Sequence, residues 1–257
     1  MEKYWILLRW LLTRPVWALH YIWFSYRNPL SRGKRHIKRN KEYEQQKTTL
    51  TEALQRACSA DRGQVDRVLK EFKNIDLNAV DESGIIPETY DFSREGALLC
   101  YAFVRLNRPE IVVETGVGRG VTSHYILRAL EENKKGRLYS IDLPLLRRGS
   151  EQATGILVPD TLKKRWTLIF GPGVRIMKKL RKKLVSIDMF IHDSNHSYLA
   201  QRAEYRRALD WLKNGGILIS DDVENDALLE TNEEFCGRLM MIAQDKAGDL
   251  GIIVKQV

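Results

Sequence analysis

Short apolar runs alternate with amphipathic stretches from residue 111 to the end of the chain, and this alternation constrains the fold most strongly. We expect strands at Ile111–Thr115, Arg137–Asp142, Trp166–Phe170, Ile187–His192, Gly216–Ser220 and Leu250–Lys255. We expect helices between them at Gly120–Glu132, Val174–Leu184 and Leu199–Lys213. Strands and helices that alternate in this way predict an α/β fold, with a parallel sheet and helices on both of its faces.

The region before this alternation is predicted to be helical and to cover one side of the sheet. Two short helices are expected over residues 48–73, with a break near Asp61–Gly63, and a loop is expected over residues 74–92. A further helix over residues 93–107 should end before Pro109, because the residue before a proline disfavours helical backbone. The predicted organisation is a basic N-terminal segment (1–41), a helical cover (42–92) and a catalytic domain (93–257).

The net charge of +9 is concentrated near the N-terminus. The first 50 residues hold 11 Lys and Arg against 3 Asp and Glu, whereas the other 207 hold 31 against 30. A nearly neutral catalytic region does not indicate a nucleic-acid-binding protein, so no nucleic-acid partner is expected. The three cysteines, Cys58, Cys100 and Cys236, show neither metal-ligand spacing nor a disulfide framework, which favours a reducing, cytoplasmic compartment.

Residues 4–26 are rich in tryptophan and leucine, and cations follow them in the segment RGKRHIKRNK (32–41). Leu8, Leu12, Leu19 and Trp23 share one face of a helix that Pro15 should kink or split. This pattern favours an amphipathic helix on the cytoplasmic face of a membrane, with residues 4–41 as the contact. A membrane span and a helix packed on the domain or on another subunit remain as alternatives. A basic run on the helix after the third strand, Lys178–Lys183, indicates a solvated face or a phosphate or lipid contact.

The first strand of the alternating region runs into the glycine turn IVVETGVGRG (111–120) and then into a helix. Gly116 and Gly118 allow the backbone to approach a ligand closely, and the helix N-terminus offers free N–H groups. Nicotinamide sites use the spacing G-x-G-x-x-G, whereas Gly120 comes one residue earlier here. The second strand ends in Asp142, 22 residues after Gly120, where a carboxylate can accept hydrogen bonds from ribose hydroxyls.

The spacing E-x-G-x-G-x-G, from Glu114 to Gly120, resembles motif I of the class I S-adenosylmethionine-dependent methyltransferases. The resemblance implies a Rossmann-like fold in which the amino-acid part of S-adenosylmethionine lies over the glycine turn. It also implies that Glu114 orders the turn and helps to hold the methionine end. The turn at Gly171–Gly173, after the third strand, would then pass near the adenine.

Polar side chains follow the fourth and fifth strands of the alternating region, in IHDSNHSY and ISDDV. The carboxyl ends of parallel strands meet at one edge of the sheet, so Asp193, Asp221 and Asp222 should lie together with His196 nearby. Three converging carboxylates repel one another unless they are protonated or bound to a metal, and oxygen ligands suit Mg²⁺ or Ca²⁺. A bound Mg²⁺ would lower the pKa of a substrate hydroxyl, and His196 would take its proton.

The segment FIHDSNHSYLAQRAEYRRALDWLKNGGILISDDVEND resembles the methyltransferase family that contains the cephalosporin-biosynthesis and macrolide-sugar O-methyltransferases. The likeness runs from about residue 90 to the C-terminus. It implies that Asp193, Asp221 and Asp222 hold Mg²⁺ and that His196 is the base. The chain departs from the family in having Asp-Asp where metal-dependent members tend to have Glu-Asp. Only one clear strand is predicted after Ser220, where the family's sheet has two.

These features together predict a magnesium-assisted O-methyltransferase whose acceptor is a small molecule, a sugar or a lipid-linked molecule. Glu114, Gly116, Gly118, Gly120, Asp142 and Gly171 are the expected cofactor-binding residues, and Asp193 and His196 are the expected catalytic ones. Two other functions remain as alternatives: an oxidoreductase that uses NAD, and a membrane-tethered protein that binds the cofactor without turnover. The first predicts NAD binding, and the second predicts cofactor binding without cofactor consumption.

Overall fold

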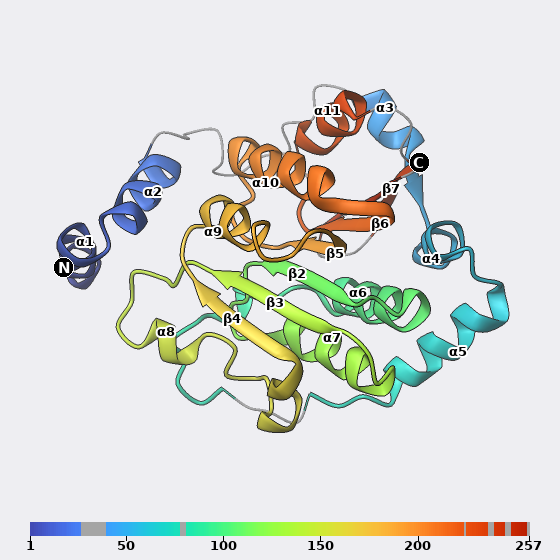
Figure 1. Ribbon diagram of the computed structural model, residues 1–257, viewed down its shortest axis with the longest axis horizontal. Helices are drawn as coiled ribbons and strands as arrows, with labels where there is room; N and C mark the ends of the chain where they lie inside the picture. The colour runs from blue at the N-terminus through green and yellow to red at the C-terminus, as the bar shows by residue number, and fades with distance from the viewer. Residues whose placement is uncertain (27–39, 78–80, 224, 236–238, 245–247, 256–257) are drawn as a thin grey trace.

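The computed structural model describes residues 1–26, 40–77, 81–223, 225–235, 239–244 and 248–255. Most of the predicted basic segment 32–41 and the third cysteine, Cys236, lie outside these residues. The described chain forms an eight-stranded sheet of order β1-β7-β8-β6-β5-β2-β3-β4 (Figure 1). Neighbouring strands are parallel, except that β8 runs antiparallel to both β6 and β7. The strands are β1 (Lys47–Thr48), β2 (Ile111–Thr115), β3 (Arg137–Asp142), β4 (Trp166–Phe170), β5 (Ile187–His192), β6 (Leu212–Ser220), β7 (Leu239–Ala243) and β8 (Leu250–Val254).

The predicted strands from β2 to β5 are confirmed with the expected bounds, whereas the far edge of the sheet differs from the prediction. Strand β6 begins at Leu212 rather than Gly216, and two strands follow it instead of one. The expectation of a single late strand is therefore wrong. The missed strand β7 reads LMMIA, and only Ile242 in it is β-branched. Methionine is flexible and carries little β-propensity, so the run gave no clear strand signal.

Helices cover both faces of the sheet, as predicted, with α6 and α7 on one face and α9, α10 and α11 on the other (Figure 1). Helix α9 ends at Leu180 and α10 at Trp211, which is earlier than expected. The two predicted short helices before the catalytic region form as well, and each begins with a capping box, at Thr49 and Asp61. The helices are α3 (Asn40–Gln45), α4 (Leu50–Cys58), α5 (Arg62–Lys73), α6 (Arg94–Asn107), α7 (Val121–Glu132), α8 (Ser150–Ala153), α9 (Gly173–Leu180), α10 (Tyr198–Trp211) and α11 (Ala227–Glu234).

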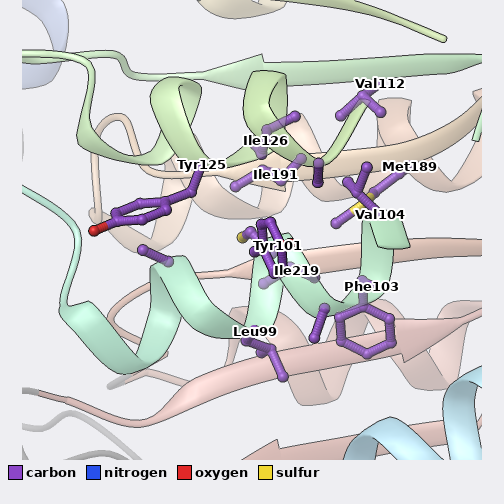
Figure 2. Close-up of a cluster of buried hydrophobic side chains, with 14 of the residues drawn as sticks. Leu99, Tyr101, Phe103, Val104, Val112, Tyr125, Ile126, Met189, Ile191 and Ile219 are labelled. Atoms are coloured by element: carbon purple, nitrogen blue, oxygen red, sulfur yellow. The ribbon is translucent and has the colours of Figure 1, made fainter. Parts of the chain in front are cut away.

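Helix α6 fills the core on one side of the sheet. Figure 2 shows its side chains Leu99, Tyr101 and Phe103 among residues of the neighbouring strands and of α7. All three are fully buried, and the same cluster includes Ile191 of β5 and Ile219 of β6. Each such side chain contributes about 1.5–3 kcal/mol when it is fully buried. The central strands are thus held rigidly, and their carboxyl ends have fixed positions.

The N-terminal segment forms two helices, α1 (Glu2–Thr13) and α2 (Pro15–Tyr26), and the predicted break at Pro15 is confirmed. The pair, called the N-terminal hairpin below, lies at the carboxyl edge of the parallel strands (Figure 1). Its buried residues Trp10 and Ala18 pack against Leu146, in the segment that follows β3. Within the described part of the chain, every helix falls short of the length and apolar character that a bilayer crossing requires.

Candidate functional site

Polar and glycine residues follow the carboxyl ends of five neighbouring strands. Thr115, His192 and Ser220 stand side by side in the register of β2, β5 and β6. Backbone hydrogen bonds extend this register past the strand ends, because Asp193 N–H donates to Thr115 O at 2.8 Å and Asp221 N–H donates to His192 O at 3.0 Å. The structure therefore brings Asp193 and Asp221 to the same edge as the glycine turn.

The glycine turn needs glycine at Gly116, because the chain after β5 passes directly against it. Gly116 has a φ of +85°, and a Cβ there would lie 1.8 Å from the carbonyl oxygen of Asp193. Gly118 (φ +52°) and Gly120 (φ +95°) also have left-handed backbone, which side chains other than that of glycine rarely adopt. The turn therefore presents bare backbone to the space above it.

Asp142 lies beside the turn and orders it. Its Oδ2 accepts hydrogen bonds from the N–H groups of Val117, at 2.8 Å, and Gly118, at 3.3 Å. Burial raises the pKa of this carboxyl group to about 6, although the two N–H donors act in the opposite direction. Asp142 lines the cavity described below. The sequence predicts that its carboxylate binds the ribose hydroxyls of the cofactor.

Glu114 lies behind the turn and is 1% exposed. Its Oε1 accepts hydrogen bonds from the hydroxyls of Ser123 and Ser140, and its Oε2 has no hydrogen-bond partner among the described residues. Burial raises the pKa of this carboxyl group to about 8, although the two serine hydroxyls lower it. Glu114 is absent from the described lining of the cavity, so its contacts fit the predicted ordering of the turn better than direct contact with a ligand.

Replacing Glu114 by glutamine is expected to make the protein more stable at alkaline pH. The folded protein keeps the Glu114 proton up to a pKa of about 8, whereas the unfolded chain loses it near pH 4.5. Stability should therefore fall as the pH rises through this window, because the folded state binds the extra proton. Glutamine mimics the protonated group at every pH, so Glu114→Gln should lose less stability than the wild type between about pH 5 and pH 8.

Thermal unfolding across this pH range would measure the effect. Glu110→Gln is the control, because the Glu110 side chain is 70% exposed and the change removes the same charge. An unchanged pH slope in Glu114→Gln would contradict the raised pKa of Glu114.

Asp193, His196 and Asp221 form a cluster at the carboxyl ends of β5 and β6. One potential ligand atom from each of the three lies within 4.8 Å of the other two. Nε2 of His196 is 3.6 Å from Asp193 Oδ1, and Nδ1 of the same ring is 2.9 Å from Asp222 Oδ2. Asp222 thus contacts Nδ1 of His196, whereas the carboxylate of Asp221 lies in the cluster with Asp193.

The charges of this cluster influence one another strongly. Burial raises the pKa of Asp221 to about 8, and the carboxylates of Asp193 and Asp222 act in the same direction. Burial alone would lower the pKa of His196, but Asp193 and Asp222 together raise it to about 10. In the absence of another cation, His196 therefore acts as the positive charge that balances the carboxylates.

Two parts of the site could not be found from the sequence. Glu204 of α10 is 4% exposed, and its Oε2 accepts hydrogen bonds from Thr115 Oγ1 at 2.6 Å, His192 Nδ1 at 2.9 Å and Ser194 Oγ at 3.2 Å. His20 and Tyr21 come from the N-terminal hairpin. His124 of α7 contacts Leu157 O at 3.2 Å and has no place in the described lining of the cavity.

These groups surround one cavity of about 240 Å³. Its walls come from the glycine turn, the ends of β3 and β4, the chain after β5, and helices α2, α9 and α10. Of the predicted cofactor-binding residues, the lining includes Gly116, Gly118, Asp142 and Gly171. Asp193 also lines it, and so the predicted cofactor edge and the predicted catalytic edge share one space.

Comparison with known protein families gives the class of the catalytic region. A family model for a methyltransferase domain matches residues 113–223, from β2 to just beyond β6. The chain therefore carries a methyltransferase domain, and the predicted enzyme class, a methyltransferase, is confirmed. No curated protein matches the chain significantly.

Several solved structures share the fold. An O-methyltransferase from Bacillus cereus in complex with SAH has 13% identity and a TM-score of 0.55, over 83% of this chain and 100% of that one. The O-methyltransferase TomG from Streptomyces achromogenes, involved in tomaymycin synthesis and solved with SAM, has 16% identity and a TM-score of 0.55, over 84% and 99%. The SAH-bound methyltransferase PaMTH1 from Podospora anserina has 12% identity and a TM-score of 0.52, over 88% and 100%. At identities this low, the structural likeness shows a shared fold alone. It confirms the predicted Rossmann-like sheet with helices on both faces.

Proposed function

We propose that the protein transfers a methyl group from S-adenosylmethionine to a hydroxyl oxygen of a small-molecule, sugar or lipid-linked acceptor. The observation that carries this proposal is one cavity that joins the glycine turn and Asp142 to Asp193. Similar folds solved with SAM or SAH support the choice of donor. We also propose that the chain belongs to the narrower group that contains the cephalosporin-biosynthesis and macrolide-sugar O-methyltransferases, as the sequence resemblance implies.

The donor would lie along the carboxyl edge of β2, β3 and β4. Gly116 and Gly118 would border its amino-acid part at the turn, Gly120 allows the turn to pack closely on Gly155, and Glu114 keeps the turn in place from behind. Asp142 would receive the ribose hydroxyls on the carboxylate that now orders the turn, and Gly171 would border the adenine. The assignments of Gly116, Gly118, Asp142 and Gly171 follow their positions in the lining of the cavity.

The acceptor hydroxyl would approach from the side of Asp193 and His196. His196 would accept the hydroxyl proton at Nε2, the ring nitrogen that faces Asp193. The sulfonium of the donor is a good leaving group, so the remaining task of the protein is to hold oxygen, carbon and sulfur in line. His196 has a raised pKa, so it can act as a base only once another cation balances its carboxylate neighbours.

A divalent cation such as Mg²⁺ fits between the carboxylates of Asp193 and Asp221, beside His196. The buried Nε2 of His196 has no hydrogen-bond partner among the described residues, and it faces a carboxylate-rich space. Asp193 and Asp221 are the ligands that we propose, and Asp222 would either complete the set or hold His196 through Nδ1. When bound there, Mg²⁺ would supply a positive charge that lowers the pKa of the acceptor hydroxyl.

Titration calorimetry with S-adenosylhomocysteine (SAH), with and without Mg²⁺, tests the proposal on the full chain. We expect SAH to bind and NAD, as the control ligand, not to bind. Any effect of Mg²⁺ on the affinity for SAH should disappear in Asp193→Ala. It should persist in Asp210→Ala, which removes an exposed carboxylate from α10. Failure of SAH to bind under every condition would overturn the proposed function, whereas binding that ignores Mg²⁺ would overturn only the metal site.

We also propose that residues 4–41 contact the cytoplasmic face of a membrane. They belong to an N-terminal segment (1–41), which a helical cover (42–92) and the methyltransferase domain (93–257) follow. Apolar side chains of the N-terminal hairpin support this proposal, since Tyr4 and Trp5 are each 71% exposed and Leu12 is 80% exposed. Exposed apolar patches of this kind mark contacts with proteins or membranes.

A further inference from the structure

The N-terminal hairpin forms part of the cavity wall. His20 and Tyr21 of α2 line the cavity together with Asp142 and Glu204. Trp17, one turn earlier, has its indole Nε1 3.3 Å from the position that a Cβ on Gly171 would occupy. Helix α2 therefore lies over the end of β4, where the donor is proposed to bind.

Contacts with the segment after β3 hold the hairpin in this position. Arg14, at the break between α1 and α2, pairs with Glu151 of α8, and its guanidinium lies 4.2 Å from the centre of the Trp17 ring. Glu2, at the start of α1, accepts a hydrogen bond from Arg148 N–H at 2.9 Å. Trp10 and Ala18 add the apolar contacts described above. The inner face of the hairpin is thus packed on the domain at both helices.

The outer face of the same hairpin carries large apolar side chains in solvent. The exposed residues are Tyr4, Trp5, Leu8, Leu11, Leu12, Leu19 and Trp23, and this set is called the outer face below. Inner and outer faces use different residues, so the hairpin can remain packed on the domain while its outer face contacts something else.

Cations on α1, and in the sequence that follows α2, favour an anionic bilayer as the occupant of the outer face. Lys3 and Arg9 are exposed on α1, and residues 27–41, which follow α2, contain seven Lys and Arg and no acidic residue. Tryptophan and tyrosine beside cations suit the headgroup region of anionic lipid.

We propose that the N-terminal hairpin docks on an anionic bilayer through its outer face and thereby closes the donor cavity, so that bilayer binding and donor binding strengthen one another. This inference rests on the proposed function, because the cavity must be the donor site. A hairpin held by the bilayer keeps Trp17, His20 and Tyr21 over the cavity, and a bound donor gives α2 a further surface on which to pack. Such coupling is reciprocal, and each ligand must raise the affinity of the other by the same factor.

The experiment compares SAH affinity of the full chain in three solutions: buffer alone, phosphatidylcholine vesicles, and vesicles that also contain phosphatidylglycerol. We expect the phosphatidylglycerol vesicles to bind the protein and to lower the Kd for SAH about fivefold or more, within the usual range of coupling between two sites. Neutral vesicles should leave the Kd for SAH unchanged.

Two variants separate the faces of the hairpin. The double variant Trp5→Glu, Leu12→Glu changes only exposed residues, so it should bind SAH as the wild type does in buffer but lose both vesicle binding and the vesicle effect. Tyr21→Ala should weaken SAH binding in buffer while vesicle binding persists. Val185→Glu is the control, because Val185 is 95% exposed and lies outside the hairpin.

Each other result overturns a specific part of the inference. Absence of SAH binding by the wild type in all three solutions would remove the proposed function itself. SAH binding that vesicles leave unchanged, or weaken, would remove the coupling alone. Vesicle binding that survives in the double variant would assign the membrane contact to the basic residues. A wild-type dimer that the double variant converts to monomers, without vesicle binding, would show that a second copy covers the outer face.

Discussion

Replacing Gly116 by alanine is expected to abolish SAH binding and to lower the stability of the protein. The added Cβ would lie 1.8 Å from the carbonyl oxygen of Asp193 and 2.8 Å from Ser194 N, both of which are backbone atoms that cannot rotate away. The glycine turn and the chain after β5 would have to separate. That movement changes the shape of the cavity in which the donor is proposed to bind, so we expect no measurable binding in titration calorimetry.

Gly215→Ala separates this effect from the cost of left-handed backbone alone. Gly215 has a φ of +76°, close to that of Gly116, but a Cβ there meets nothing within 4 Å. The control should therefore lose only about 1–2 kcal/mol, the cost of a side chain in left-handed conformation, and should bind SAH normally. If Gly116→Ala bound SAH as tightly as Gly215→Ala does, the cavity at the glycine turn would not be the donor site.

The glycine turn could be predicted because its signal is local. A strand, three closely spaced glycines and a helix follow one another within a short stretch, and the structure places them as expected. The convergence of Asp193 and Asp221 also followed from the sequence, since parallel strands must bring their carboxyl ends to one edge.

The remaining parts of the site depend on contacts between distant parts of the chain. Glu204 is 89 residues from Thr115 in the sequence, and nothing in its helix marks it as a buried acceptor of three hydrogen bonds. His20 reaches the cavity only because the N-terminal hairpin packs on the segment after β3. The sequence favoured a membrane contact for this hairpin because of its tryptophans. In the structure these tryptophans are divided between the face packed on the domain and the outer face, since Trp10 is buried and Trp5 is exposed.

Replacing Glu204 by alanine is expected to destabilise the protein by about 2–6 kcal/mol, because each of two fully buried donors that loses its acceptor costs about 1–3 kcal/mol. The change would leave Thr115, His192 and Ser194 without the acceptor that they share, and Thr115 and His192 are fully buried. Burial opposes ionisation of Glu204, yet hydrogen bonding to His192, Thr115 and Ser194 lowers its pKa, so the site is built around the charged carboxylate.

Two further variants test this explanation through the free energy of unfolding in urea. Glu204→Gln keeps one carbonyl oxygen as an acceptor, so it should lose less stability than Glu204→Ala. Asp210→Ala removes an exposed carboxylate from the same helix and should change the free energy of unfolding by less than about 0.5 kcal/mol, as surface substitutions usually do. If Glu204→Ala were as stable as Asp210→Ala, the buried hydrogen bonds around Glu204 would not be what fixes α10 against β2 and β5. The wall that α10 contributes to the proposed donor cavity would then need another explanation.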